Sequence, residues 1–332
     1  MLNIAQIGCG YWGPNLLRNL VGNKDCNMKV VIELSERRRE FVKGLYPAVT
    51  VSGNIQMIFD DPSIDAVIVA TPVASHFDLT HRFLDAGKHV LVEKPMATTV
   101  SEVEQISKLA KKKNLVAMVG HTFLYNVAVR HLKQLIDSGE LGDVRYIYSR
   151  RLNLGRIRSD VDALWNFAPH DISIIQYLLN NQRPISVTRQ GMDYVQEGVD
   201  DVVFMHLVYP NKIMAHIHVS WLDPDKVRKM IVVGSKKMAV YDDIADNKIA
   251  IYDKGIDRMA VLGKDMDYDQ PPVFKFNHRS GDIILPKIDF IEPLEAEIAH
   301  FVECIQKGIK CLTGVEHAKE VIKILSWREE SK

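Results

Sequence analysis

The sequence predicts an α/β protein with an N-terminal doubly wound parallel sheet and a C-terminal α+β domain on a large, mostly antiparallel, open-faced sheet. In the first third, short apolar runs alternate with amphipathic helical patterns, as in parallel sheets covered by helices. A Gly-x-Gly-x-x-Gly segment directly follows the first apolar run. Beyond residue 140 the apolar residues alternate with period two, which favours antiparallel strands with one solvated face. The 332 residues suit two domains, which we place at residues 1–122 and 123–332.

The expected strands of the first domain are short, apolar and bounded by turn residues. They lie at residues 4–7, 29–32, 66–70, 89–92 and 116–119. Between them, apolar residues recur at three- and four-residue spacing, which predicts helices at residues 16–21, 77–86 and 103–112.

In the second domain, a helix is expected from about residue 126 to 138, where Gly139 ends it. Period-two alternation then predicts strands at residues 144–148, 202–208, 213–221 and 227–233. Helices are expected at residues 162–179, 294–307 and 316–327. Residues 253–290 are rich in Asp, Pro and Gly and have no clear period, so we predict a loop there.

The bulk composition argues against several classes of partner. Lys and Arg total 42, as do Asp and Glu, so no net charge draws the chain to nucleic acid or an anionic membrane. We see no signal peptide and no apolar run of about 20 residues, and we expect a soluble, cytoplasmic protein. No Cys-x-x-Cys pair occurs, and Cys304 and Cys311 do not have zinc-knuckle spacing, so we expect no metal site.

The glycine-rich segment predicts a dinucleotide-binding Rossmann domain. It reads Gly8-Cys9-Gly10-Tyr11-Trp12-Gly13, between the first strand and the first helix. Gly8 permits a tight turn, Gly10 permits close approach of a pyrophosphate, and Gly13 permits close packing of helix on strand. The N–H groups at the start of the helix then face the phosphates.

An acidic residue at the end of the second strand favours NAD as the cofactor. Glu33 follows Gly13 by the roughly 20 residues at which a ribose-binding acid is expected. Its charge would repel the 2′-phosphate of NADP. Arg37 and Arg38 follow closely and could hold such a phosphate, so NADP remains the less favoured alternative.

Three further segments end neighbouring strands of the predicted parallel sheet. They are Thr71-Pro72 with His76, then Glu93-Lys94-Pro95, and then His121. Ligands of open α/β sheets lie across the carboxyl ends of the strands. We therefore expect these residues to surround the nicotinamide half of the cofactor.

Together these motifs carry a family resemblance that extends over essentially the whole chain. The sequence resembles the glucose–fructose oxidoreductase/inositol dehydrogenase (Gfo/Idh/MocA) family in the glycine loop, Thr71-Pro72 with His76, Glu93-Lys94-Pro95, His170 and Glu292-Pro293-Leu294. The resemblance implies a nicotinamide-dependent dehydrogenase that acts on CH–OH groups of a sugar or polyol. It also implies that Lys94 lies beside the reacting hydroxyl, where a lysine can transfer a proton.

The second domain departs from the family pattern around its histidine. The family usually has an Asp four residues before this histidine, where Asn166 stands here, and a second acid three residues after it, where Ser173 stands. An amide can orient a hydroxyl but cannot accept its proton. Lys94 and His170 are therefore the candidate catalytic residues. Asn166 is a candidate substrate ligand, and Asp171 is a candidate substrate-binding or imidazole-orienting group.

Arginines in the second domain point to an anionic substrate. Arg156, Arg158 and Arg279 could bind phosphate or carboxylate, although each could equally be a solvated surface residue. The segment leading to Asn166 is similar to the nucleotide-sugar branch of the family, whose members include 3-dehydrogenases of UDP-linked N-acetyl-hexosamine derivatives. Two alternatives remain: a dehydrogenase of free inositol or a simple sugar, and a non-catalytic NAD-binding regulator. An open-faced sheet can also pair with a second subunit, so we expect a homodimer or homotetramer.

Overall fold

The computed structural model describes residues 1–155, 157–260 and 274–327, and the chain forms two compact units. The first comprises Met1–Val127, Leu164–Arg183 and the C-terminal segment from Phe290. The second comprises Ala128–Ala163 and Pro184–Asp289. The expected division into residues 1–122 and 123–332 was sequential, whereas these units are discontinuous. Three helices from the second half of the chain, described below, belong to the first unit.

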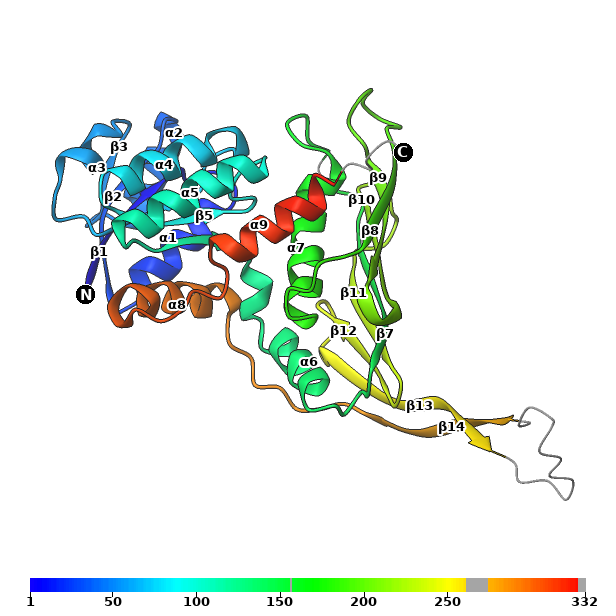
Figure 1. The fold of residues 1–332 in the computed structure, drawn as a ribbon. Coiled ribbons are helices and arrows are strands. Elements are labelled where there is room, and N and C mark those ends of the chain that lie inside the picture. The colour runs from blue at the N-terminus through cyan, green and yellow to red at the C-terminus, as the bar shows by residue number, and fades with distance from the viewer. Residues whose placement is uncertain (156, 261–273, 328–332) are drawn as a thin grey trace, which may run out of the picture. The chain divides into compact units, whose positions relative to one another are not determined.

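The first unit contains a six-stranded parallel sheet in the order β3-β2-β1-β4-β5-β6, drawn in blue to cyan in Figure 1. The strands are β1 (Leu2–Ile7), β2 (Cys26–Ile32), β3 (Thr50–Ser52), β4 (Ala66–Val69), β5 (His89–Glu93) and β6 (Ala117–Gly120). Helices α1 (Gly13–Gly22), α4 (His76–Asp85) and α5 (Val100–Lys113) connect them. The strand order reverses between β1 and β4, and ligands of such sheets bind at this switch point. The predicted doubly wound sheet is confirmed.

Three elements of this unit were not predicted from the sequence: α2 (Glu36–Leu45), β3 and α3 (Gln56–Asp60). Helix α2 buries only Val42 and exposes most of its charged residues, so its apolar period is weak. Strand β3 has three residues, and α3 has five, of which Ile58 is the buried one. Elements this short leave little periodicity for a sequence argument to detect.

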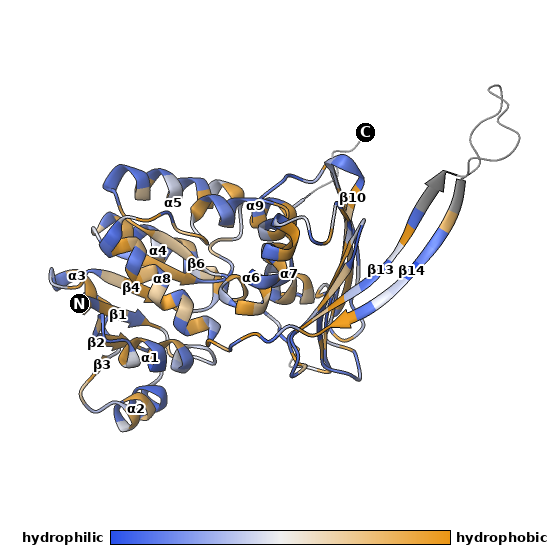
Figure 2. Ribbon diagram, turned by 90° about the horizontal axis from the view of Figure 1, so that it is seen from below, coloured by the Kyte–Doolittle hydropathy of each residue, from blue (hydrophilic) through white to orange (hydrophobic). Residues whose placement is uncertain are grey.

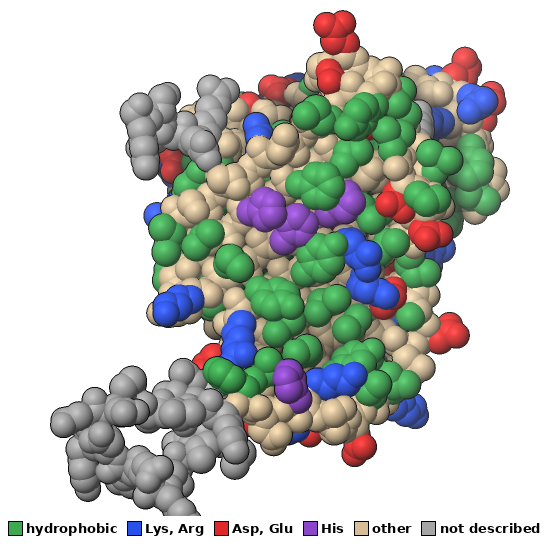
Figure 3. Space-filling view, turned by 90° about the vertical axis from the view of Figure 1, so that its right-hand side faces the viewer, with side chains coloured by type: hydrophobic (Ala, Val, Ile, Leu, Met, Phe, Trp, Pro, Cys, Tyr) green, Lys and Arg blue, Asp and Glu red, His purple; other side chains and the backbone are tan. Residues whose placement is uncertain are grey.

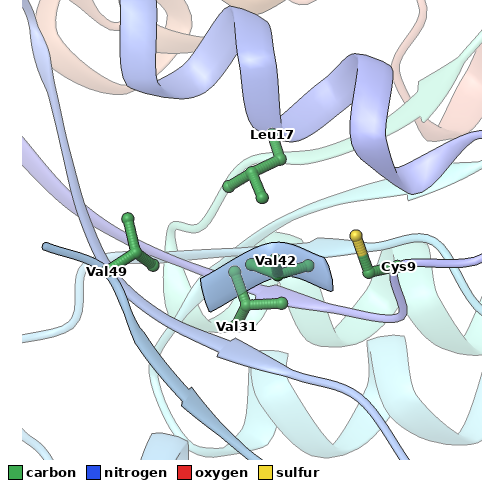
Figure 4. Close-up of a cluster of buried hydrophobic side chains, with 5 residues drawn as sticks. All are labelled: Cys9, Leu17, Val31, Val42 and Val49. Carbon is green, nitrogen blue, oxygen red and sulfur yellow. The ribbon is translucent and has the colours of Figure 1, made fainter. Parts of the chain in front are cut away.

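A compact apolar cluster fixes the glycine loop against the sheet. Cys9, Leu17, Val31, Val42 and Val49 are all buried and pack together from the loop, α1, β2, α2 and the segment before β3 (Figure 4). Each Å² of apolar surface that such a cluster removes from water stabilises the folded state by about 25 cal/mol. The cysteine of the glycine loop is thus part of the core.

Three helices from the second half of the chain belong to this unit. They are α7 (Ala163–Leu178), α8 (Pro293–Lys307) and α9 (Val315–Leu325). Helix α9 packs against α5, and α8 packs against α1. The turn between α8 and α9 reaches the sheet, where the N–H of Val119 donates to the carbonyl of Thr313 at 2.9 Å. Among the described helices, none has the length and apolar character needed to cross a membrane.

The second unit contains an eight-stranded sheet in the order β14-β13-β12-β11-β7-β10-β9-β8. Its elements are α6 (Val127–Asp137), β7 (Val144–Leu152), β8 (Ser186–Met192), β9 (Val202–Tyr209), β10 (Ile213–Ser220), β11 (Val227–Gly234), β12 (Met238–Asp242), β13 (Ile249–Ala260) and β14 (Phe274–Ile284). Strands β7 and β10 pair in parallel, and the other pairs are antiparallel. The predicted open, mostly antiparallel sheet is confirmed.

The prediction of a loop over residues 253–290 was wrong for residues 253–260 and 274–284, and residues 261–273 lie outside the described residues. Much of this segment belongs to β13 and β14, which pair with one another at the edge of the sheet (Figure 1). Residues 253–257 and 277–282 are Asp-Lys-Gly-Ile-Asp and Asn-His-Arg-Ser-Gly-Asp, mostly hydrophilic as the blue and white stretches of Figure 2 show, so they lack the alternation that marks a half-buried strand. Ion pairs between the two strands help to stabilise their pairing, since Arg279 of β14 binds Asp253 and Asp257 of β13.

One face of the large sheet is apolar and histidine-rich, as Figure 3 shows. Three rows of side chains cross β9, β10 and β7: Val208–Met214–Tyr146, His206–His216–Tyr148 and Phe204–His218–Arg150. Phe204, Val208, Met214 and Tyr146 are exposed. The rings of Phe204 and His218 stack with centroids 4.2 Å apart. Exposed apolar groups gathered in rows are typical of an association surface.

Candidate active site

The glycine loop has the geometry expected of a phosphate-binding turn. Gly8 has a φ of +87°, and a Cβ there would lie 2.4 Å from the carbonyl oxygen of Ala70. A Cβ at Gly13 would lie 2.8 Å from the carbonyl oxygen of Gly8. At Gly10, the nearest atom to such a Cβ is Nη1 of Arg38, 3.7 Å away. The fold therefore requires glycine at Gly8 and Gly13, while Gly10 leaves room for a ligand.

Glu33 lies beside this loop, as its spacing predicted. One carboxylate oxygen accepts the N–H of Cys9 at 2.7 Å, and the other accepts the N–H of Ser35 at 2.9 Å. Arg38 donates to the carbonyl of Cys9 at 2.8 Å, whereas Arg37 is exposed on the first turn of α2. Of the two arginines, Arg38 is thus the one that contacts the glycine loop.

We expect Glu33→Gln to lower the ratio of the NADP dissociation constant to the NAD dissociation constant by about tenfold. This corresponds to roughly 1.4 kcal/mol of lost repulsion between Glu33 and the 2′-phosphate. The amide keeps an acceptor for one of the two backbone N–H groups and removes the charge. Dissociation constants for both dinucleotides, measured by quenching of intrinsic fluorescence, test this, with Glu36→Gln on the exposed start of α2 as the control. An unchanged ratio of the two constants would show that Glu33 does not face the 2′ position.

His76 joins the ends of β4 and β5. Its Nε2 lies 2.8 Å from the carbonyl oxygen of Thr71, and its Nδ1 lies 2.7 Å from that of Pro95. The ring is 1% exposed, and this burial lowers the pKa of His76. The histidine was predicted to contact the cofactor. The ring lies between two backbone carbonyls, and a neutral imidazole can donate its single N–H to one of them. This places His76 between Thr71-Pro72 and Lys94-Pro95, and its contact with the cofactor stays a prediction.

Glu93 connects the glycine loop with the end of β6. The indole of Trp12 donates a hydrogen bond to its carboxylate, and a Cβ at Gly120 would lie 3.2 Å from its Oε1. Burial raises the pKa of Glu93 above its usual range, although the charge of Lys94 opposes this. Trp12 is 39% exposed and Tyr11 is 87% exposed, so both can meet a ligand above the loop.

The sequence reasoning missed two titratable groups packed behind this edge of the sheet. Glu297 of α8 is fully buried and accepts a hydrogen bond from Thr122 at 2.8 Å. His317 of α9 packs edge-on against the buried ring of His121, with centroids 5.1 Å apart. Both residues occupy the apolar stripes of their helices, and a polar residue in such a stripe is the signal that could have revealed them.

Burial raises the pKa of Glu297 well above its ordinary value, and the negative charge of Glu93 adds to this. The folded protein therefore holds a proton that the unfolded chain releases near pH 4, so this group lowers stability as pH rises from there to the folded pKa. We expect Glu297→Gln to be more stable than the parent at pH 8 by roughly 1–3 kcal/mol, and nearly equal at pH 4.5. Denaturant titrations at both pH values test this. A loss of stability in Glu297→Gln at pH 8 would show that the Glu297 carboxylate is ionised at that pH and stabilises the folded protein.

Lys94, which follows β5, contacts the helix that carries His170. The Nζ of Lys94 donates to the backbone carbonyl of Asn166 at 2.7 Å. Asn166 and His170 are four residues apart on α7 and therefore share a face. The ring of His170 packs edge-on against Phe123, with centroids 5.0 Å apart. The structure thus brings together the end of β5 and the histidine helix.

Asp171 and Ser173 are placed differently from His170. Asp171 is 3% exposed, and successive helical residues point about 100° apart, so its side chain leaves α7 in another direction from the imidazole. Ser173, at the position of the family's second acid, donates its hydroxyl to the backbone carbonyl of His170 at 2.7 Å. It supports the helix locally.

The predicted substrate arginines already have carboxylate partners within the second unit. Arg158 forms a bidentate ion pair with Asp160, with Nε donating to Oδ1 at 2.8 Å and Nη2 donating to Oδ2 at 2.5 Å. Arg279 binds Asp253 at 2.9 Å and Asp257 at 2.7 Å. Arg156 lies outside the described residues. To bind a substrate anion, Arg158 and Arg279 would have to break these ion pairs with the carboxylates of the chain.

Two family models match successive parts of the chain. Residues 2–121 match an oxidoreductase family with an NAD-binding Rossmann fold, and residues 129–240 match the Gfo/Idh/MocA C-terminal domain. The chain belongs to the Gfo/Idh/MocA family of oxidoreductases. The predicted family and its oxidoreductase class are thereby confirmed, and the six-stranded parallel sheet lies in the part of the chain that matches the family's Rossmann-fold model.

Several relatives within this family have named activities. UDP-N-acetylglucosamine 3-dehydrogenase of Acidithiobacillus ferrooxidans is 27% identical over 58% of this chain and 59% of its own length. Its solved structure matches with a TM-score of 0.79 at 21% identity, covering 98% of this chain and 95% of that one. NADP(+)-dependent scyllo-inositol 2-dehydrogenase of Bacillus subtilis is 33% identical over 41% of this chain and 37% of its own length. These sequence alignments span less than two thirds of each relative.

The name of a third relative describes a different class of reaction. The 2,7-anhydro-N-acetylneuraminate hydratase of Mediterraneibacter gnavus is 22% identical over 96% of this chain and 86% of its own length. Membership of the Gfo/Idh/MocA family therefore leaves the net reaction of this chain to be argued from its site.

Proposed function

We propose that this Gfo/Idh/MocA member is an NAD-dependent dehydrogenase that oxidises a CH–OH group of a nucleotide-linked sugar, in the manner of a 3-dehydrogenase of a UDP-N-acetyl-hexosamine or its uronate. The observation that carries the proposal is the hydrogen bond from Lys94 to the turn of α7 that bears Asn166 and His170. It holds Lys94 against the turn of α7 that also carries His170, a second residue able to accept a proton. A protein that only bound NAD would have no need of this pairing.

The glycine loop fits the proposed cofactor. Room at Gly10, the start of α1 at Gly13 and the carboxylate of Glu33 would hold the pyrophosphate and the adenosine ribose. When bound, the nicotinamide supplies a hydride acceptor.

The chain's own residues would handle the proton. The substrate hydroxyl would lose its proton to the protein while its carbon gives up a hydride, for which bound NAD would supply the acceptor, so that a carbonyl group forms. Lys94 or His170 accepts the proton, and the Asn166 amide orients a neighbouring hydroxyl. His76 and Glu93 hold the Lys94 segment in place through their contacts with Pro95 and Trp12.

Thermal unfolding with added ligands tests the proposed cofactor and substrate class. A ligand that binds only the native state raises the melting temperature by mass action. We expect NAD to raise it more than NADP does at equal concentration, and UDP-N-acetylglucosamine or its uronate to raise it further with NAD present. A further rise with myo-inositol but not with the nucleotide sugars would favour the free-polyol alternative. No further rise with any of these compounds would favour the regulatory alternative.

We also propose that the exposed rows on β9, β10 and β7 form a subunit interface in a homodimer or homotetramer. Phe204→Asp would place a charge among buried apolar groups at such an interface. We expect this variant to sediment with a smaller oligomeric state than the parent at micromolar concentration. Asp223→Ala, in the turn after β10, is the control. A monomeric parent protein would contradict the proposal.

A further inference from the structure

Three metal-ligating side chains converge at the end of α8 and in the turn that follows it. They are His300, Cys304 and Cys311, and their ligand atoms all lie within 4.8 Å of one another. His300 and Cys304 are four residues apart on α8, so they share a face of the helix. The helix ends at Gly308, whose φ of +65° turns the chain and returns Cys311 to that face.

The segment that carries Cys311 is fixed on both sides of the cluster. The N–H of Leu312 donates to Nε2 of His300 at 3.0 Å. The next residue, Thr313, accepts the N–H of Val119 at 2.9 Å through its carbonyl, and its hydroxyl lies 3.0 Å from that of Tyr125. The position of Cys311 therefore follows from a backbone that is tied to α8 and to β6.

The geometry matches that of a tetrahedral metal. The Sγ of Cys304 lies 3.4 Å from the Nε2 of His300. Bonds of about 2.3 Å to sulfur and 2.1 Å to nitrogen would place these atoms about 3.6 Å apart in a tetrahedral zinc site. Because Nε2 accepts the N–H of Leu312, it is the unprotonated nitrogen of the ring, and zinc would take its lone pair in place of that N–H. Cys304 is 2% exposed, while His300 and Cys311 are half-buried.

We propose that His300, Cys304 and Cys311 form a zinc-binding site with a fourth position open to water. Two thiolates and an imidazole select zinc over magnesium or calcium, which prefer oxygen ligands. Each thiol releases its proton on binding. The bound metal would hold the α8–α9 turn together, and the bond between Thr313 and Val119 connects that turn to β6, which leads into His121.

Cobalt substitution and zinc competition test the proposal. The full-length protein is stripped with a chelator under a non-thiol reductant, and Co²⁺ is then titrated in. We expect one equivalent to give a thiolate-to-cobalt charge-transfer absorption, which one equivalent of Zn²⁺ abolishes. Cys311→Ser and His300→Gln are expected to weaken zinc binding at least tenfold in competition with a chromogenic chelator. Cys26→Ser, which removes a cysteine elsewhere in the unit, is the control and is expected to bind as the parent does.

Melting temperatures measured on the same proteins give a second reading that does not depend on activity. Zinc is expected to raise the melting temperature of the parent and of Cys26→Ser, and to leave that of Cys311→Ser unchanged. The proposal fails if the parent binds no zinc when fully reduced, or if Cys311→Ser and His300→Gln bind it as tightly as the parent. Magnesium that competes with zinc at equal concentration would also overturn it.

Discussion

Replacing Lys94 with Met is expected to lower kcat by about two to four orders of magnitude, the usual contribution of a positioned proton-transfer group. Methionine keeps most of the length of the side chain and removes the charge and the donor. The bond from Nζ to the carbonyl of Asn166, at 2.7 Å, would be lost, and with it the link between the end of β5 and α7. NAD binding should persist, because the glycine loop and Glu33 are untouched.

Two controls separate a chemical role of Lys94 from a structural one. Lys112→Met, on the exposed end of α5, should have parental activity. The dissociation constant of Lys94→Met for NAD, measured by fluorescence, should stay within about threefold of the parent. If Lys94→Met turns over at a near-parental rate with NAD bound, then Lys94 is not the proton-transfer group and His170 becomes the remaining candidate.

Replacing Gly8 with Ala is expected to destabilise the protein by roughly 2–5 kcal/mol and to abolish dinucleotide binding. The added Cβ would lie 2.4 Å from the carbonyl oxygen of Ala70 and 2.8 Å from its carbonyl carbon, and these are backbone atoms that cannot rotate away. A positive φ at a residue with a side chain costs about 1–2 kcal/mol, and overpacking costs about 1–3 kcal/mol more. Denaturant unfolding measures the loss.

Gly44→Ala is the matched control for this substitution. Gly44 lies in α2, and a Cβ there meets nothing within 4 Å. Alanine is favoured over glycine in a helix by about 1 kcal/mol, so this variant should be as stable as the parent or slightly more stable. Equal destabilisation by both substitutions would show that Gly8 does not hold the turn described above.

The strands and motifs that were predicted correctly from the sequence are those whose structure depends on a short, local sequence pattern. Buried parallel strands are continuous apolar runs, and a glycine between strand and helix with an acid about 20 residues later leaves few alternatives. This spacing predicted Glu33 as the ribose-binding acid, and the structure places its carboxylate at the glycine loop, where it accepts the N–H of Cys9. The motifs after β4 and β5 were also placed at the correct edge of the sheet, because parallel strands share that edge.

The parts that sequence did not predict depend on contacts between distant segments. The role of His76 could not be read from its spacing, because its partners, Thr71 and Pro95, lie on two different loops. The pairing of β13 with β14 is stabilised by charges that look like those of a loop. Cys304 and Cys311 are separated by a helix end, and only the turn at Gly308 brings them together with His300.

Reduction of bound nicotinamide is the most direct test of the central claim. The parent protein would be mixed with NAD and, separately, with UDP-N-acetylglucosamine, its uronate and myo-inositol, and the near-ultraviolet absorption of reduced nicotinamide would be followed through a single turnover. We expect reduction with a nucleotide sugar, slowed by deuterium on the reacting carbon and lost in Lys94→Met. No reduction with any of these compounds, in a protein that binds NAD, would contradict the dehydrogenase assignment.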